Sequence, residues 1–283
     1  MELQTKGTLY LCATPIGNLE DMTYRAVRML GEAGLIAAED TRHTRQLLTH
    51  FDIHTKLTSY HEHNKFAKGP ELIEYLLAGN DLICVSDAGL PGICDPGSHL
   101  AELAIEAGIR VSPLPGCNAG LSALICSGLD TTLFTFVGFL PRTAKKQQEI
   151  LTKIRSYEGT LIFYEAPHHL KGTLKQLAAG LGDRRAVLGR ELTKKFEEFR
   201  RGSLTELLAW YSEHDPRGEY VILIEGAGAQ IESAVQSDLP LDPAECCQQL
   251  MAQGLDKKTA MRETAKKLGI SRRDVYQALL EHE

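Results

Sequence analysis

The chain has 283 residues, about the length of two domains, and 43% hydrophobic with 24% charged residues is the composition of an ordinary globular protein. Its amino terminus lacks a basic flank followed by an apolar core, and no stretch approaches about 18 apolar residues. We therefore expect a cytoplasmic protein that is neither exported nor membrane-spanning. Seven cysteines without a C-x-x-C pair indicate neither a disulfide framework nor a zinc ribbon.

The net charge of -6 argues against general coating of nucleic acid, yet the basic residues gather in two segments. Residues 142–155 carry Arg142, Lys145, Lys146, Lys153 and Arg155 against one acidic residue, and residues 254–276 carry seven basic residues against three acidic ones. Such segments suggest a local contact with a polyanion. Solvated helix faces would give the same pattern.

The first 115 residues alternate between strands and helices. Strands are predicted at 9–13, 35–39, 81–86 and 110–114, and helices at 19–30, 42–51, 70–77 and 96–107. This alternation predicts a largely parallel sheet with helices on both faces. Ligands of such sheets bind at the carboxyl ends of the strands.

The pattern changes after a helix of small residues at 118–127. Strands are predicted at 134–139, 160–165, 186–192 and 220–225, separated by helices at 145–156, 168–179 and 204–211. We expect a first α/β domain at 1–117 and a second α/β domain with a mixed sheet at 118–228.

The remaining residues predict a linker at 229–241 and a small helical module at 242–283. Asp242, Pro243 and Glu245 form a helix start, Gly254 is a stop signal, and two further short basic helices follow. This arrangement resembles a helix-turn-helix and is a possible RNA contact.

Three loops combine glycine and proline between a strand and a helix. Their sequences are T-P-I-G-N-L at 14–19, S-D-A-G-L-P-G-I-C-D-P-G at 86–97 and L-P-G-C-N-A-G at 114–120. Glycine permits close approach of a ligand to the backbone, and proline makes the loop rigid. Because all three loops follow strands of one sheet, they would converge on one pocket. A purely structural turn would use the same residues. The dinucleotide fingerprint and the P-loop pattern are both absent from the sequence.

Further motifs follow in order between residues 8 and 226. They are A-A-E-D-T-R-H-T at 37–44, S-Y-H-E-H-N at 59–64, G-F-L-P-R at 138–142, F-Y-E-A-P-H at 163–168 and R-E-L-T-K at 190–194. With the three loops, they resemble the ribose 2′-O-methyltransferase branch of the tetrapyrrole methylase superfamily. The resemblance implies an α/β fold with two lobes, the class III methyltransferase fold, followed by a small C-terminal helical module.

The same resemblance implies the ligands and partners. The methyl donor would be S-adenosylmethionine, the acceptor a cytidine ribose in the decoding region of the small-subunit rRNA or 30S particle, and the protein a homodimer. Residues 1–117 would form the acceptor side and part of the donor cleft. Transferred by motif, the donor contacts from the three loops would be Ala13, Thr14, Asp87, Leu90, Asn118 and Ala119. The adenine contacts from the second lobe would be Tyr164, Leu192, Tyr220 and Val221.

Three positions depart from the family pattern. Leu90 replaces a threonine and Asn118 lies in a P-G-C-N-A version of the third loop, but both can still offer backbone N–H groups. His169 replaces an arginine, which puts an RNA or phosphate contact in doubt.

The catalytic candidates come from two polar clusters, Glu39-Asp40-Thr41-Arg42-His43 at the end of the second strand and His61-Glu62-His63-Asn64. Arg42 is suited to bind phosphate, while Asp40 or His61 would take the proton of the acceptor hydroxyl. Helix capping would also explain Asp40. The H-x-H spacing is too weak to indicate a metal, so none is expected.

Two other functions remain open at this stage. The donor pocket would also suit a methyltransferase that acts on a tetrapyrrole or a protein side chain. A non-catalytic RNA-binding protein on a methylase scaffold is the alternative from another class.

Overall fold

The computed structural model describes residues 6–228, 242–252 and 255–281. The predicted linker at 229–241 and the stop signal Gly254 lie outside the described residues. The chain divides into two compact units, residues 1–226 and residues 227–283. None of the described helices is both long and apolar enough to cross a membrane.

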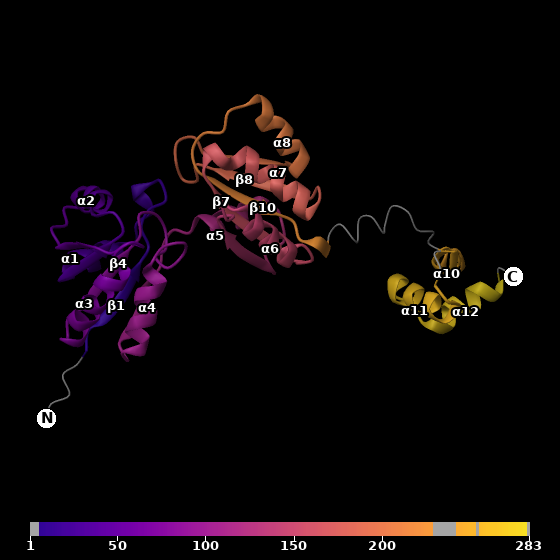
Figure 1. Ribbon diagram of the computed structural model, residues 1–283, viewed down its shortest axis with the longest axis horizontal. Helices are drawn as coiled ribbons and strands as arrows, with labels where there is room; N and C mark the ends of the chain where they lie inside the picture. Colours follow the sequence, from indigo (N-terminus) through magenta and orange to yellow (C-terminus); the bar gives the residue numbers. More distant parts are fainter. Residues whose placement is uncertain (1–5, 229–241, 253–254, 282–283) are drawn as a thin grey trace. The chain divides into compact units, whose positions relative to one another are not determined.

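The first sheet has five parallel strands in the order β3-β2-β4-β1-β5, which confirms the predicted parallel sheet (Figure 1). Its elements are β1 (Thr8–Cys12), η1 (Leu19–Asp21), α1 (Tyr24–Glu32), β2 (Leu35–Ala38), α2 (Thr41–His50), β3 (Leu57–Ser59), α3 (Lys65–Leu77), β4 (Leu82–Val85), α4 (Gly97–Glu106) and β5 (Arg110–Leu114).

Helices cover both faces of this sheet. The central strand β4 is buried along its whole length, so its sequence shows no polar alternation. Leu82 and Cys84 pack with residues of α3 and α4, whereas Ile83 and Val85 pack with residues of α1 and α2. Successive side chains of β4 therefore enter two separate cores.

The second sheet is mixed and has the order β6-β7-β10-β8-β9, with β6 and β7 parallel and the other pairs antiparallel. Its elements are α5 (Ala119–Ser127), β6 (Phe134–Gly138), α6 (Ala144–Ile154), β7 (Thr160–Glu165), η2 (Pro167–His169), α7 (Leu170–Leu181), β8 (Arg185–Arg190), β9 (Glu198–Ser203), α8 (Leu204–Glu213) and β10 (Tyr220–Ile224). One face packs against α6, α7 and α8, and the other face packs against α5.

Several element boundaries differ from the prediction. The short strand β3 and the charged edge strand β9 were not predicted. Helix α3 begins five residues before Pro70, which lies inside it. Thr23 caps α1 and separates it from η1, so the predicted helix at 19–30 is two elements. Strand β8 ends at Arg190 because the next residue, Glu191, has a φ of 49°.

The C-terminal unit contains the helices α10 (Pro243–Ala252), α11 (Lys257–Leu268) and α12 (Arg272–Glu281). Each helix contacts the other two. Their shared core includes Ala244, Cys247, Ala260, Val275 and Leu279. Asp256 caps α11 and Gly269 ends it in the left-handed conformation.

Candidate functional site

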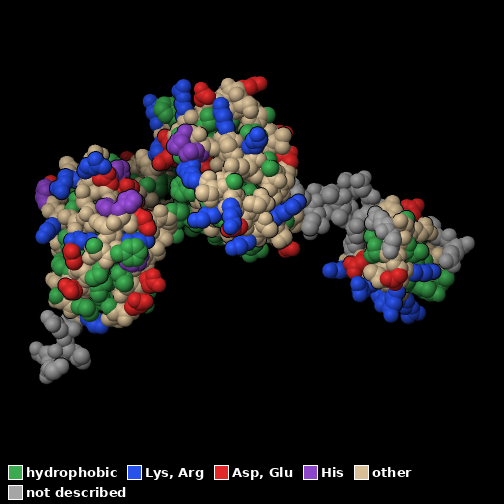
Figure 2. Space-filling model, viewed as in Figure 1, with side chains coloured by type: hydrophobic (Ala, Val, Ile, Leu, Met, Phe, Trp, Pro, Cys, Tyr) green, Lys and Arg blue, Asp and Glu red, His purple; other side chains and the backbone are tan. Residues whose placement is uncertain are grey.

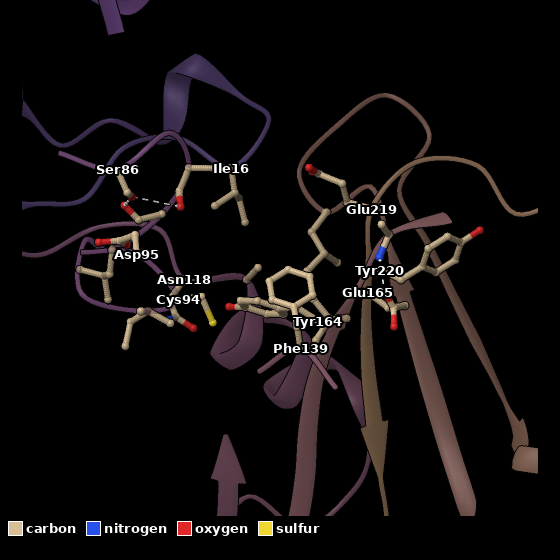
Figure 3. A pocket seen from close by; sticks show the side chains of 18 of the residues that line it. Ile16, Ser86, Cys94, Asp95, Asn118, Phe139, Tyr164, Glu165, Glu219 and Tyr220 are labelled. Atoms are coloured by element: carbon tan, nitrogen blue, oxygen red, sulfur yellow. Dashed lines mark hydrogen bonds between the residues drawn. The ribbon is translucent and has the colours of Figure 1, made fainter. Parts of the chain in front are cut away.

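A pocket of about 300 Å³ lies between the carboxyl ends of the strands of the first sheet and strand ends of the second sheet (Figure 3). Its volume is in the range of small-ligand sites, roughly 300–1,000 Å³. From the first lobe it is lined by Ile16, Glu39, Ser86, Ala88, Gly89, Leu90, Ile93, Cys94 and Asp95. From the start of α5 and the second lobe it is lined by Asn118, Ala119, Phe139, Tyr164, Glu165, Ala166, Glu191, Leu192, Lys194, Glu219, Tyr220 and Val221. All three glycine-containing loops therefore reach one pocket, as predicted.

Thr14 joins the loop after β1 to the loop after β4. Its backbone N–H donates to the Gly89 carbonyl at 2.9 Å, and the Gly89 N–H donates back at 3.1 Å. The Thr14 hydroxyl also donates to the Ser86 carbonyl at 3.1 Å. Thr14 is 3% exposed, so these bonds are shielded from water. These bonds fix the position of residues 86–90 relative to the carboxyl ends of β1 and β4.

Asp95 holds the second half of the same loop. One carboxylate oxygen accepts the N–H groups of Gly92 at 2.7 Å and Gly97 at 2.8 Å. Burial raises the pKa of Asp95, although these backbone donors counteract it. Gly89 and Gly92 have φ values of 79° and 90°, a conformation in which glycine carries no steric penalty. The loop is therefore rigid and exposes backbone to the pocket.

The second lobe offers an apolar wall. Tyr164, Leu192 and Val221 belong to the core cluster on the α5 face of the sheet. The Tyr164 hydroxyl accepts the N–H of Gly120 at 3.0 Å, which ties β7 to the first turn of α5. The Phe139 ring packs edge-to-face on Tyr164, with centroids 5.9 Å apart. Figure 3 shows both rings on the side of the pocket opposite Ser86 and Asp95.

The neighbours of these residues along the strands point to the other face. Tyr220 packs with α7 and α8, so mainly its backbone borders the pocket. Glu165 accepts the hydroxyl of Thr173 on α7 and the N–H of Ala166. Both residues support the strand ends rather than present a functional side chain.

Lys194 lies at the rim of the pocket between two carboxylates. Its ammonium group is 3.0 Å from Glu191 and 3.1 Å from Glu219. Burial lowers the pKa of Lys194, but the hydrogen bonds and charges of these carboxylates outweigh it and raise the pKa above the usual lysine value. The three side chains form a partly buried ionic group that closes one side of the pocket.

The structure brings together most of the donor-binding residues that the sequence predicts. The residues that line the pocket are Leu90, Asn118, Ala119, Tyr164, Leu192, Tyr220 and Val221. Ala13 and Thr14 are buried beneath it, each 3% exposed. The Asp87 carboxylate accepts the N–H of Asp40 at 2.9 Å and does not line the pocket.

The three catalytic candidates do not line the pocket. Asp40 caps α2 through the Arg42 N–H at 2.8 Å and also pairs with the Arg42 guanidinium at 2.7 Å. These bonds hold the pKa of Asp40 well below its usual range. His61 has a buried Nδ1 without a hydrogen-bond partner in the described residues. Glu39 belongs to the same predicted polar cluster as Asp40 and Arg42 but was not chosen within it, and it does line the pocket.

In the described part of the chain, no group of three or more His, Cys, Asp or Glu side chains is placed to hold a metal ion.

Comparisons with known proteins agree with this architecture. Residues 8–208, which span nearly all of both sheets, match the model of the family Tetrapyrrole (Corrin/Porphyrin) Methylases. A diphthine synthase structure superimposes with a TM-score of 0.61 at 14% identity, covering 77% of this chain and 89% of that one. A uroporphyrin-III C-methyltransferase from Thermus thermophilus, solved in complex with S-adenosyl homocysteine, gives 0.53 at 18% identity, covering 80% and 100%. The chain therefore has the fold of the tetrapyrrole methylases.

A much nearer relative identifies the branch. The chain is 49% identical over 271 residues to "Ribosomal RNA small subunit methyltransferase I" of Halalkalibacterium halodurans, covering 96% of this chain and 94% of the relative. The chain belongs to the tetrapyrrole methylase family and, within it, to the ribosomal RNA small subunit methyltransferase I family.

Replacing Gly89 by alanine tests whether the loop after β4 depends on its left-handed residue. At a φ of 79°, a side chain costs about 1–2 kcal/mol, so Gly89→Ala should lower the free energy of unfolding by that amount. Gly172, in α7, has open space around the added carbon, so Gly172→Ala should instead stabilise by about 0.5–1 kcal/mol. Urea unfolding of both variants measures the difference, and equal midpoints would contradict the described geometry.

Proposed function

We propose that this protein transfers the methyl group of S-adenosylmethionine to the ribose 2′-hydroxyl of a cytidine in the decoding region of small-subunit rRNA. The observation that carries the proposal is the near full-length identity to a ribosomal RNA small subunit methyltransferase I, joined to a pocket at the sheet edge. An rRNA substrate implies that the protein works in the cytoplasm.

The pocket suits the methyl donor. The apolar wall of Tyr164, Leu192 and Val221 fits an adenine ring, while the backbone-rich loop 86–97 fits the polar amino-acid end. Asn118 caps α5 through the Leu121 N–H at 2.8 Å, so the positive end of that helix borders the pocket. A helix amino terminus favours a carboxylate.

The residues of this chain would act chiefly by positioning. When bound, S-adenosylmethionine supplies a methyl group that the positive sulfonium already activates. Holding two reactants in line contributes about 7–11 kcal/mol, whereas a general base typically contributes about 10² to 10⁴-fold in rate. The buried bonds of Thr14 and Asp95 would keep the donor loop in its binding geometry without motion.

Two exposed basic surfaces would contact the RNA. We call Arg142, Lys145, Lys146, Lys153 and Arg155, all exposed in or beside α6, the α6 basic surface. The second surface is on the C-terminal unit and comprises Lys257, Lys258, Arg262, Lys266, Arg272 and Arg273, all exposed. Figure 2 shows Lys and Arg side chains gathered around α11. Arg42, whose side chain is 88% exposed, stays a candidate for a further phosphate contact.

We further propose a homodimer, as the family resemblance implies. The edge strand β6 exposes Phe134 and Phe136, and α5 exposes Leu121 and Ile125. Exposed apolar side chains on an unpaired strand edge are suited to contact with a second protein chain.

The alternatives differ in acceptor or in catalysis. A tetrapyrrole acceptor is favoured by the name of the matched family and by uroporphyrin-III methyltransferase neighbours of 18–20% identity, whereas the rRNA acceptor is favoured by relatives of 44–49% identity. A non-catalytic RNA-binding protein would not bind the donor, which calorimetry with S-adenosylmethionine detects.

Methyl transfer to isolated small ribosomal subunits tests the proposal. With methyl-labelled donor, we expect the label on one cytidine ribose of the rRNA, located by mass spectrometry of nuclease fragments. Label found only on protein or on a small molecule would overturn the rRNA assignment.

Variants of Tyr164 test the donor wall. Alanine removes the ring, and since stacking of a base on an aromatic side chain is worth about 1–3 kcal/mol, donor affinity should fall about 5- to 150-fold. Phenylalanine keeps the ring and loses only the hydrogen bond with Gly120, so its loss should be much smaller. Calorimetry with S-adenosylhomocysteine measures both. Equal affinities of Tyr164→Ala and the wild type would place the adenine elsewhere.

Removal of residues 242–283 tests the C-terminal basic surface. The pocket is lined entirely by residues of the first unit, so the shortened chain should bind the donor as the full chain does. RNA affinity should fall, and each lost phosphate contact should reduce the log-log salt slope by about 0.7–0.9. Arg272→Ala with Arg273→Ala in the full chain should give an intermediate loss. Unchanged RNA affinity after truncation would rule out this surface.

A further inference from the structure

Glu39 occupies a distinct position at the pocket. It follows Ala38, the last residue of β2, which pairs with Val85 of β4, so Glu39 lies beside Ser86 at the carboxyl edge of the sheet. The three glycine-containing loops follow β1, β4 and β5. Glu39 therefore borders the pocket from β2, on the side of β4 away from β1. An acceptor hydroxyl placed beside the loop 86–97 would contact the Glu39 carboxylate.

The other carboxylates of the pocket are held by groups of the protein. Asp95 accepts two backbone N–H groups of its own loop. Glu165 accepts the hydroxyl of an α7 threonine and a backbone N–H. Glu191 and Glu219 share the ammonium group of Lys194. Each of these four is engaged in holding a loop or a strand end.

The remaining titratable groups of the pocket are poor proton acceptors at neutral pH. Burial raises the pKa of the Cys94 thiol and of the Tyr164 phenol, which keeps both groups protonated. Lys194 carries a raised pKa and stays charged. Glu39 is thus the pocket group best placed to accept a proton.

The surroundings of Glu39 strengthen its basicity. Burial raises its pKa above the usual value, and the negative charges of Asp87, Asp95 and Asp40 add to the effect. A backbone hydrogen bond from Asp87 opposes the rise in part, and no cation is among the groups that act on Glu39. Arg42, on α2, is engaged by Asp40. In its ionised form, a carboxylate with a raised pKa is a stronger base than an ordinary one.

The loop after β4 also fixes where Glu39 lies. The Asp87 carboxylate accepts the N–H of Asp40 at 2.9 Å, which anchors the chain immediately after Glu39. The capping bond of Asp40 to Arg42 then begins α2. Glu39 is therefore held between the end of β2 and the start of α2.

We infer that Glu39 is the general base that takes the proton of the acceptor hydroxyl, an inference that rests on the proposed function. The bond from the ribose oxygen to the methyl carbon forms while the bond between the methyl carbon and sulfur breaks. The electron pair of the broken bond stays on sulfur. The hydroxyl proton passes to the Glu39 carboxylate and is then released to water. The products are the methylated ribose and a neutral thioether.

The test compares Glu39→Gln with Asp40→Asn in single-turnover methylation of small ribosomal subunits. Both changes remove one carboxylate at adjacent positions, and asparagine keeps the helix-capping ability of Asp40. We expect Glu39→Gln to slow methyl transfer about 10² to 10⁴-fold, the usual range for a general base, and Asp40→Asn to lose far less. The wild-type rate should rise with pH through the raised Glu39 pKa and then level, and Glu39→Gln should lack this inflection. Calorimetry with S-adenosylhomocysteine should give wild-type affinity for both variants.

The outcomes separate the two proposals. If the wild type labels rRNA but Glu39→Gln keeps its rate and its pH inflection, or Asp40→Asn loses as much as Glu39→Gln, only the assignment of the base fails. If Glu39→Gln is slow because it no longer binds S-adenosylhomocysteine, Glu39 supports the pocket and the assignment also fails. If the wild type does not label rRNA, the proposed function fails and the base assignment fails with it.

Discussion

The bridge between Thr14 and Gly89 fixes the rest of the site. Two backbone hydrogen bonds and the Thr14 hydroxyl join the loops that follow β1 and β4, and water is excluded from them. Because these loops follow neighbouring strands of a parallel sheet, the bridge joins them into one continuous surface. The left-handed conformation of Gly89 lets the backbone make this turn at the sheet edge. Asp95 then closes the remainder of the loop by accepting two N–H groups from it.

The opposite wall depends on the alternation of side chains along two strands of the second sheet. Tyr164 and Val221 face α5 and the pocket, whereas their neighbours Glu165 and Tyr220 face α7 and α8. A shift of one residue in either strand would exchange an apolar surface for a carboxylate and a core tyrosine. The hydrogen bond from Gly120 to the Tyr164 hydroxyl opposes such a shift, because it also ties the strand to α5. The apolar wall and the rigid loop are therefore secured independently.

Much of this arrangement can be predicted from the sequence, because buried strands and glycine-containing loops leave strong local patterns. The four apolar residues of β4 followed by S-D-A-G predict both a strand and a ligand loop. The three-residue strand β3 is too short to produce a pattern, and Pro70 obscures the true start of α3. The choice between Glu39 and Asp40 cannot be made from sequence either. Both are acidic residues at a strand end. Only the structure shows that Glu39 borders the pocket while Asp40 caps α2.

The pocket brings together a rigid polar loop, an apolar wall and a carboxylate without a cationic partner among the groups that act on it. This combination matches a donor with an adenine at one end and an amino acid at the other, beside an acceptor that must lose a proton. The most direct measurement is a crystal structure of the protein with S-adenosylhomocysteine. We expect the adenine against Tyr164, Leu192 and Val221 and the amino-acid end along residues 86–97. Binding at any other place, or no binding at saturating ligand, would contradict the assignment of the pocket.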